Sequence, residues 1–125
     1  MEFPADRRYH PEHMWARLKG KIVTVGISDY AQDQLGQVKY LDLPEPGQEV
    51  IAGEEMGAVE SAKSVSDLIS PVTGEVAAVN LELEGDPALV NQDPYGDGWI
   101  AKIVLEDLDQ VEALLEAGEY EASLG

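Results

Sequence analysis

The fold is decided by the stretch Met56-Gly-Ala-Val-Glu-Ser-Ala-Lys-Ser-Val-Ser-Asp-Leu-Ile69, in which two apolar-rich segments flank four small and polar residues. The two segments predict short strands over 56–60 and 65–69. The tetrapeptide 61–64 has the composition of a turn, so the stretch predicts a hairpin with these four residues at its tip. Lys63 then stands on the tip among side chains too small to shield it.

The sequence on either side of this hairpin predicts more short strands joined by tight turns. Strands are expected over 38–43, 75–80 and 99–105, and 15–27 is expected to form a hairpin that turns at Gly20-Lys21. Glycine or proline marks each of the other turns, which are expected at 44–47, at Gly53 and over 70–74.

Helices are expected only as short pieces at the edges of this β structure. Ser28 is a typical N-cap and Gly36 a typical stop, so 28–36 predicts a short helix. Asp86 followed by Pro87 predicts a capped helical turn through Val90.

Near the end of the chain, Leu108, Val111, Leu114 and Leu115 have helical spacing, which Gly118 is expected to end, with a second short turn around Tyr120. The expectation is therefore one domain over 1–125, mainly β, with short peripheral helices.

Composition restricts the classes of function. Eight basic and twenty-five acidic residues give a net charge of −17, which repels nucleic acid and anionic membranes and favours partners with a basic docking face. The chain has no cysteine, and no triad, glycine-rich phosphate loop or metal cluster is evident, so no catalytic residue is predicted. With no recognisable secretion signal, the expected location is cytoplasmic.

The distribution of positive charge draws attention to Lys63. Six of the eight cations precede Tyr40, and only Lys63 and Lys102 follow it. A lysine on an exposed tip can be acylated by an enzyme that encloses the tip, whereas a catalytic lysine requires burial.

The residues around Lys63 resemble the signature of lipoyl and biotinyl carriers. Biotin carriers place methionine on both sides of the lysine, but Ala62 and Ser64 stand there, so lipoyl attachment is preferred. Longer blocks resemble the glycine cleavage system H protein family: Val25-Gly-Ile-Ser-Asp-Tyr-Ala-Gln-Asp-Gln-Leu-Gly36, Leu43-Pro-Glu-Pro-Gly47, Val59-Glu-Ser-Ala-Lys63, Ser66-Asp67, Val90-Asn-Gln-Asp-Pro-Tyr-Gly-Asp-Gly-Trp99 and Glu119-Tyr120.

This resemblance implies a barrel-sandwich hybrid like that of lipoyl domains, built from two antiparallel sheets. It implies a carrier with lipoate on Lys63 that takes the aminomethyl group of glycine from glycine decarboxylase to an aminomethyltransferase and is reoxidised by dihydrolipoamide dehydrogenase. A lipoate ligase or lipoyltransferase would attach the cofactor. Recognition around the hairpin is assigned to Glu60, Ser61, Ser64 and Asp67.

One position departs from the family pattern. H proteins usually read His-Glu-Trp where this chain has His13-Met14-Trp15, and that glutamate helps to hold the cationic amine of the loaded arm beside the aspartate matching Asp67. Methionine cannot form an ion-paired hydrogen bond, and Glu12 is expected to point the other way if the segment is a strand. The candidate arm cleft comprises Glu12, Met14 and Gln34.

Two alternatives stay open at this point. Met14 is also compatible with the H-like lipoate-binding proteins that serve heterodisulfide-reductase-like complexes in sulfur oxidation, and an unlipoylated interaction or regulatory domain would use the same scaffold. The pair His10 and His13 is expected to be structural, because a metal would need further ligands at close spacing. The aromatic residues Trp15, Tyr40 and Trp99 are expected to lie in the core or at its rim.

Overall fold

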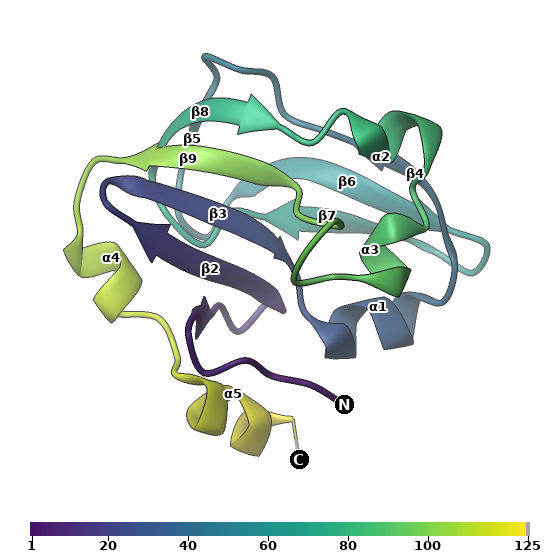
Figure 1. The fold of residues 1–125 in the computed structure, drawn as a ribbon, viewed down its shortest axis with the longest axis horizontal. Helices are drawn as coiled ribbons and strands as arrows, with labels where there is room; N and C mark the ends of the chain where they lie inside the picture. Colours follow the sequence, from purple (N-terminus) through teal and green to yellow (C-terminus); the bar gives the residue numbers. More distant parts are fainter. Residues whose placement is uncertain (125) are drawn as a thin grey trace.

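The structure, a computed structural model, describes residues 1–124 and consists of two antiparallel β-sheets with short helices around them. The larger sheet has the strand order β1-β2-β3-β9-β8-β5 and the smaller one the order β4-β6-β7. In Figure 1, β6 and β7 lie behind β3 and β9. The strands are β1 (Arg8–Tyr9), β2 (Met14–Lys19), β3 (Ile22–Ile27), β4 (Val38–Asp42), β5 (Glu49–Val50), β6 (Glu55–Ser61), β7 (Val65–Ile69), β8 (Gly74–Val79) and β9 (Ala101–Leu105).

The core fills the space between the inward faces of the two sheets. Val23, Val25 and Ile103 of the larger sheet are buried in one cluster with Val59 and Leu68 of the smaller sheet. Buried residues alternate with exposed ones along β9, as a strand with one buried face requires. This arrangement confirms the expected mainly β barrel-sandwich architecture.

The hairpin that the sequence places at 56–69 forms as expected. Strands β6 and β7 pair antiparallel, with Glu60 opposite Val65, and the tip between them spans 62–64. In Figure 1 this tip lies at the right-hand end of the molecule, at the opposite end from the turn between β2 and β3. Lys63 is thus at one extremity of the fold.

Helix α1 (Asp29–Leu35) has the caps predicted for it. Ser28 accepts a hydrogen bond from the backbone N–H of Ala31 at 3.2 Å, and the N–H of Gly36 donates to the carbonyl of Gln32 at 3.1 Å. Gly36 has φ 73° and ψ −162°, a backbone conformation that is essentially restricted to glycine. The helix therefore ends abruptly beside the start of β4.

The remaining helices are α2 (Glu82–Gly85), α3 (Leu89–Gln92), α4 (Asp109–Glu112) and α5 (Ala117–Ser123). The prediction at Asp86 was wrong: this residue follows α2 as its C-cap, and α3 begins at Leu89 with no side-chain cap. The prediction at Gly118 was also wrong, because Gly118 lies inside α5. A capping box between Glu116 and Glu119 starts α5 and carries the chain past the glycine.

A second, aromatic cluster joins the two ends of the chain. Tyr9 and Tyr120 are fully buried, and their rings stack with centroids 4.8 Å apart. Tyr9 also pairs with Leu115 through an isolated β-bridge. The two-residue strand β1 was not predicted, because its order depends on this contact with the C-terminal segment.

Candidate functional site

The tip of the β6–β7 hairpin is ordered by the side chain of Ser61. Its Oγ accepts hydrogen bonds from the backbone N–H groups of Lys63 and Ser64, each at 3.2 Å, and the N–H of Ser61 donates to the carbonyl of Ser64 at 2.9 Å. Ser61 is buried whereas Lys63 and Ser64 are exposed. The backbone of Lys63 is thus fixed while its side chain stays accessible.

The stem of Lys63 lies against the end of α1. A Cβ atom built on Gly36 would come within 3.3 Å of Cε and 3.6 Å of Nζ of Lys63. Within residues 1–124 the ion pairs are Arg7–Asp6 and Arg8–Glu116, so no carboxylate lies within 4.0 Å of the Lys63 amine. The amine is therefore available to a reagent or an enzyme.

A cavity of about 440 Å³ lies on the same side of the molecule as α1 and β7. Its lining brings together the three residues predicted for an arm cleft, Glu12, Met14 and Gln34. The cavity is also lined by Asp67, a residue that was predicted to take part in recognition at the hairpin. The other lining residues are His13, Ile27, Tyr30, Ala31, Leu35, Val59, Ser66, Leu68 and Ile69.

The position of Glu12 differs from the expectation. Residues 11–13 form a turn before β2, and His13 has φ 72°, the only positive φ among the non-glycine residues of the described chain. Glu12 and Met14 both line the cavity, so the expectation that Glu12 points the other way was wrong. Residues two apart lie on the same face of a strand, and the turn at His13 keeps both residues at one cavity. Met14 is almost fully buried, whereas Glu12 is exposed, so the cavity has an apolar floor and a carboxylate at its margin.

Sequence reasoning missed the hydrogen-bonded group that supports this wall. The Oη atom of Tyr120 lies 2.8 Å from Nδ1 of His13 and 2.8 Å from Oγ of Ser28. Burial lowers the pKa of His13 and raises the pKa of Tyr120. Helix α5 therefore contacts His13, a lining residue of the cavity, through Tyr120. These residues are too far apart in sequence for local patterns to reveal the contact.

The pair His10 and His13 was expected to be structural. In the described part of the chain no group of three or more His, Cys, Asp or Glu residues is placed to hold a metal ion. Nδ1 of His10 accepts from the N–H of Glu12 at 3.0 Å, and His13 contacts Tyr120. Both histidines therefore have structural partners.

The outward face of the smaller sheet carries exposed side chains beside Lys63. Glu60 lies between Tyr40 and Val65 in register, and all three are exposed. Asp67 is opposite Ala58, one row further from the tip. Of the predicted aromatics, Trp15 is buried and Trp99 half-buried, but Tyr40 lies on the surface with 59% of its area exposed.

The chain resembles proteins of one family over nearly its whole length. The family model described as "Glycine cleavage H-protein" matches residues 7–125. A glycine cleavage system H protein of Thermus thermophilus is 51% identical over 124 residues, which cover 99% of this chain and 97% of the relative. One of Acinetobacter baumannii is 48% identical and covers 99% and 100%, respectively.

A solved structure agrees with these sequence relatives. The crystal structure of a glycine cleavage system H protein from Mycobacterium marinum matches with a TM-score of 0.90 and 41% sequence identity, covering 98% of each chain. Neither comparison favours a sulfur-oxidation carrier or an unlipoylated domain.

Proposed function

This chain belongs to the glycine cleavage H-protein family and is a lipoyl carrier of the glycine cleavage system; from that premise we propose that Lys63 is its attachment site. The observation that carries the proposal is an exposed amine on an ordered hairpin tip. An enzyme that transfers an acyl group must enclose the amine, and a tip at the end of the molecule can enter its active site.

The residues near Lys63 fit a lipoyl arm. The stem of Lys63 passes over Gly36, and the neighbouring Leu35 lines the 440 Å³ cavity. Met14, Ile27 and Leu68 provide apolar surface inside it, which suits the hydrocarbon part of the arm. When attached, the lipoyl group supplies a disulfide that accepts the aminomethyl group of glycine and is reduced in doing so.

We propose that the cavity holds the charged end of the loaded arm with Glu12 and Asp67. Both carboxylates line the cavity, and both are exposed at its margin. A cationic amine gains charge-assisted hydrogen bonds from such groups, which Met14 cannot offer. Glu12 would then bind the amine in place of the glutamate that the family usually has at the position of Met14.

The partners follow from the carrier role. We propose that glycine decarboxylase, an aminomethyltransferase and dihydrolipoamide dehydrogenase act in turn on the arm, after a lipoate ligase or lipoyltransferase has recognised the tip at Glu60, Ser61, Ser64 and Asp67. The chain itself contributes binding and positioning without catalysis. A cysteine-free composition suits a reducing compartment, and we propose the cytoplasm as its location. No helix within residues 1–124 has the length and apolar character needed to cross a membrane.

Glycine–bicarbonate exchange tests this function. The protein is lipoylated with a ligase and combined with glycine decarboxylase from the same source, beside Lys63→Arg and the control Lys39→Arg. Lys39 is also exposed, on β4, between Val38 and Tyr40, which pair with Ser61 and Glu60. Its replacement therefore removes a second exposed amine near the tip. Wild type and Lys39→Arg should support exchange and Lys63→Arg should not. Exchange supported equally by all three proteins would reject the assignment of Lys63.

A further inference from the structure

The outward face of the larger sheet concentrates positive charge on a strongly acidic protein. Arg17 of β2 and Lys102 of β9 both lie opposite Thr24 of β3, so the two cations flank one residue in register. Neighbouring positions across strands are about 5 Å apart, which places both cations on one small area. Lys19 lies on the same face, two residues beyond Arg17. We refer to Arg17, Lys19, Thr24, Trp99 and Lys102 as the basic face.

These cations lack acidic partners within the described chain. Neither Arg17 nor Lys102 has a carboxylate within 4.0 Å, although the protein has twenty-five acidic residues. Nζ of Lys102 instead lies 5.0 Å from the centroid of the Trp99 ring. The largest cause of the lowered pKa of Asp6 is its hydrogen bond with Arg7, and the charge of Arg17 contributes less. Asp6 is therefore the partner of Arg7 and not of Arg17. Glu75, opposite Val104, borders the face on the side of β8.

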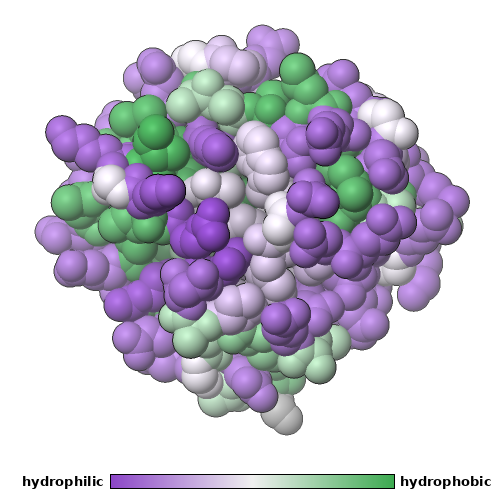
Figure 2. Space-filling view, viewed as in Figure 1, coloured by the Kyte–Doolittle hydropathy of each residue, from purple (hydrophilic) through white to green (hydrophobic). Residues whose placement is uncertain are grey.

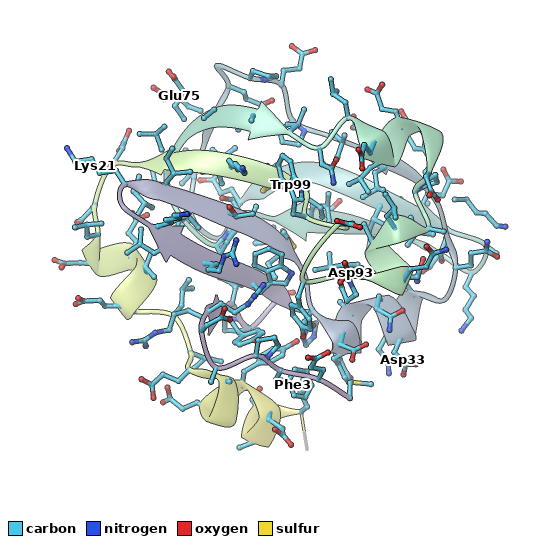
Figure 3. The ribbon with its side chains drawn as sticks, viewed as in Figure 1. Phe3, Lys21, Asp33, Glu75, Asp93 and Trp99 are labelled. Atoms are coloured by element: carbon cyan, nitrogen blue, oxygen red, sulfur yellow. The ribbon has the colours of Figure 1, made fainter. Side chains whose placement is uncertain are left out.

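A hollow of about 270 Å³ lies between the two cations. It is lined by Arg17, Thr24, Trp99 and Lys102, together with Trp15, Tyr95 and Gly96. Figure 3 shows Trp99 near the centre of this side of the molecule, in front of the larger sheet. In Figure 2 the same side has a pale central band of intermediate hydropathy between strongly hydrophilic residues. The surface therefore offers two cations, a hydroxyl and an aromatic ring to one ligand.

We propose that the basic face docks an acidic segment of one of the other glycine cleavage proteins, an inference that rests on the carrier role proposed above. A carboxylate there would pair with the guanidinium of Arg17 or the ammonium of Lys102. An apolar or aromatic neighbour on the same segment would pack on Trp99. A nucleic acid is disfavoured because the whole chain carries a net charge of −17, which repels a long polyanion over its full length but a short acidic segment much less. A second copy of the chain would bring the same negative charge.

The location of the face explains what such docking achieves. It lies on the outer side of the larger sheet, whereas the β6–β7 hairpin belongs to the smaller sheet behind it (Figure 1). A partner held at the basic face therefore leaves the Lys63 tip uncovered. Tethering the carrier in this way raises the effective concentration of the arm at the partner's active site.

Charge reversal with a charge-matched control tests the proposal. Arg17→Glu and Lys102→Glu each change the net charge by the same amount as Lys39→Glu, which lies on β4 of the other sheet. Each variant is lipoylated, its intact mass is measured, and its dissociation constants for purified glycine decarboxylase, aminomethyltransferase and dihydrolipoamide dehydrogenase are determined at low salt. Arg17→Gln and Lys102→Gln serve if a reversal lowers the melting temperature.

The expected result is that at least one partner binds Arg17→Glu and Lys102→Glu about tenfold more weakly than wild type, because reversal replaces attraction by repulsion. Lys39→Glu should change that affinity less than threefold. Equal weakening by Lys39→Glu, or no weakening for any partner, would overturn the proposal. It would also be overturned if the wild type self-associated through this face. A wild type without a lipoyl mass increment would instead count against the proposed attachment at Lys63.

Discussion

Replacing Ser61 with alanine should loosen the hairpin tip while leaving Lys63 chemically intact. The change removes the acceptor for two backbone N–H groups, those of Lys63 and Ser64, both at 3.2 Å. An intramolecular hydrogen bond contributes about 0.5–1.5 kcal/mol net, and these two are long, so the tip should lose about 1–2 kcal/mol of local ordering. A loss of 1.4 kcal/mol lowers the population of the ordered tip relative to disordered ones by about tenfold.

The assay is the steady-state rate of lipoylation by a purified ligase, with kcat and KM determined separately. If the ligase binds the ordered tip, the cost falls on kcat/KM, which should decrease by about three- to tenfold. Ser70→Ala is the matched control: Ser70 is also buried and its Oγ donates to the carbonyl of Val72 at 2.6 Å, but it lies at the other end of β7. Ser70→Ala should lower the melting temperature without slowing lipoylation. Unchanged kcat/KM for Ser61→Ala would refute the argument that an ordered tip is recognised.

Three further changes have defined outcomes. Gly36→Ala forces a side chain into φ 73°, ψ −162° and should lower the free energy of unfolding in urea by about 1–3 kcal/mol. The control Gly85→Ala, where a Cβ meets nothing within 4 Å, should be nearly neutral. Equal effects would contradict the argument that alanine is strained at position 36. Because the pKa of His13 is lowered in the folded state, the unfolded state takes up this proton first as pH falls, so the melting temperature should decrease from pH 7.5 to pH 5.5. His13→Asn keeps a residue that tolerates φ 72° and should make that decrease smaller. An identical decrease in both proteins would contradict the prediction. Glu12→Gln should release the aminomethyl group at least threefold faster than wild type, since an ion-paired hydrogen bond is lost. The control Glu45→Gln, outside the cavity, should release it at the rate of the wild type. Equal release rates for both variants would show that Glu12 does not hold the amine.

Local signals in the sequence predicted the parts of the fold that local interactions determine. The alternation in 56–60 and 65–69 and the small residues between them predicted the hairpin, and Ser28 and Gly36 predicted the ends of α1. These features depend on turn chemistry, capping and pleat, which act within a few residues. The exposure of Lys63 followed from the same reasoning.

The errors arose where a contact distant in sequence overrides a local signal. Glycine commonly ends a helix, but Gly118 lies inside α5. The helix continues past it because of the capping box between Glu116 and Glu119 and the burial of Tyr120. Asp86 resembles an N-cap, but its backbone N–H ends α2 by donating to the carbonyl of Glu82. Helix α2 was missed because it is a single turn anchored by one buried residue, Leu83.

The sequence predicted only part of the lining of the candidate cavity, and not its geometry. Glu12, Met14 and Gln34 were expected at a cleft, and all three line one cavity. The expectation that Glu12 points away from Met14 was wrong because residues two apart lie on the same face of a strand. The positive φ of His13 between them was also not predicted. That conformation accompanies the hydrogen bond between His13 and Tyr120, which lies 107 residues further along the chain.

Site-resolved mass spectrometry of the protein produced together with a lipoylating enzyme tests the attachment most directly. Fragmentation of the peptide that contains residues 61–65 should place one lipoyl amide on Lys63 and leave Lys39 and Lys102 unmodified. A lipoyl group on either of those lysines, or none on Lys63 when a reference carrier is fully modified in the same cells, would contradict the account.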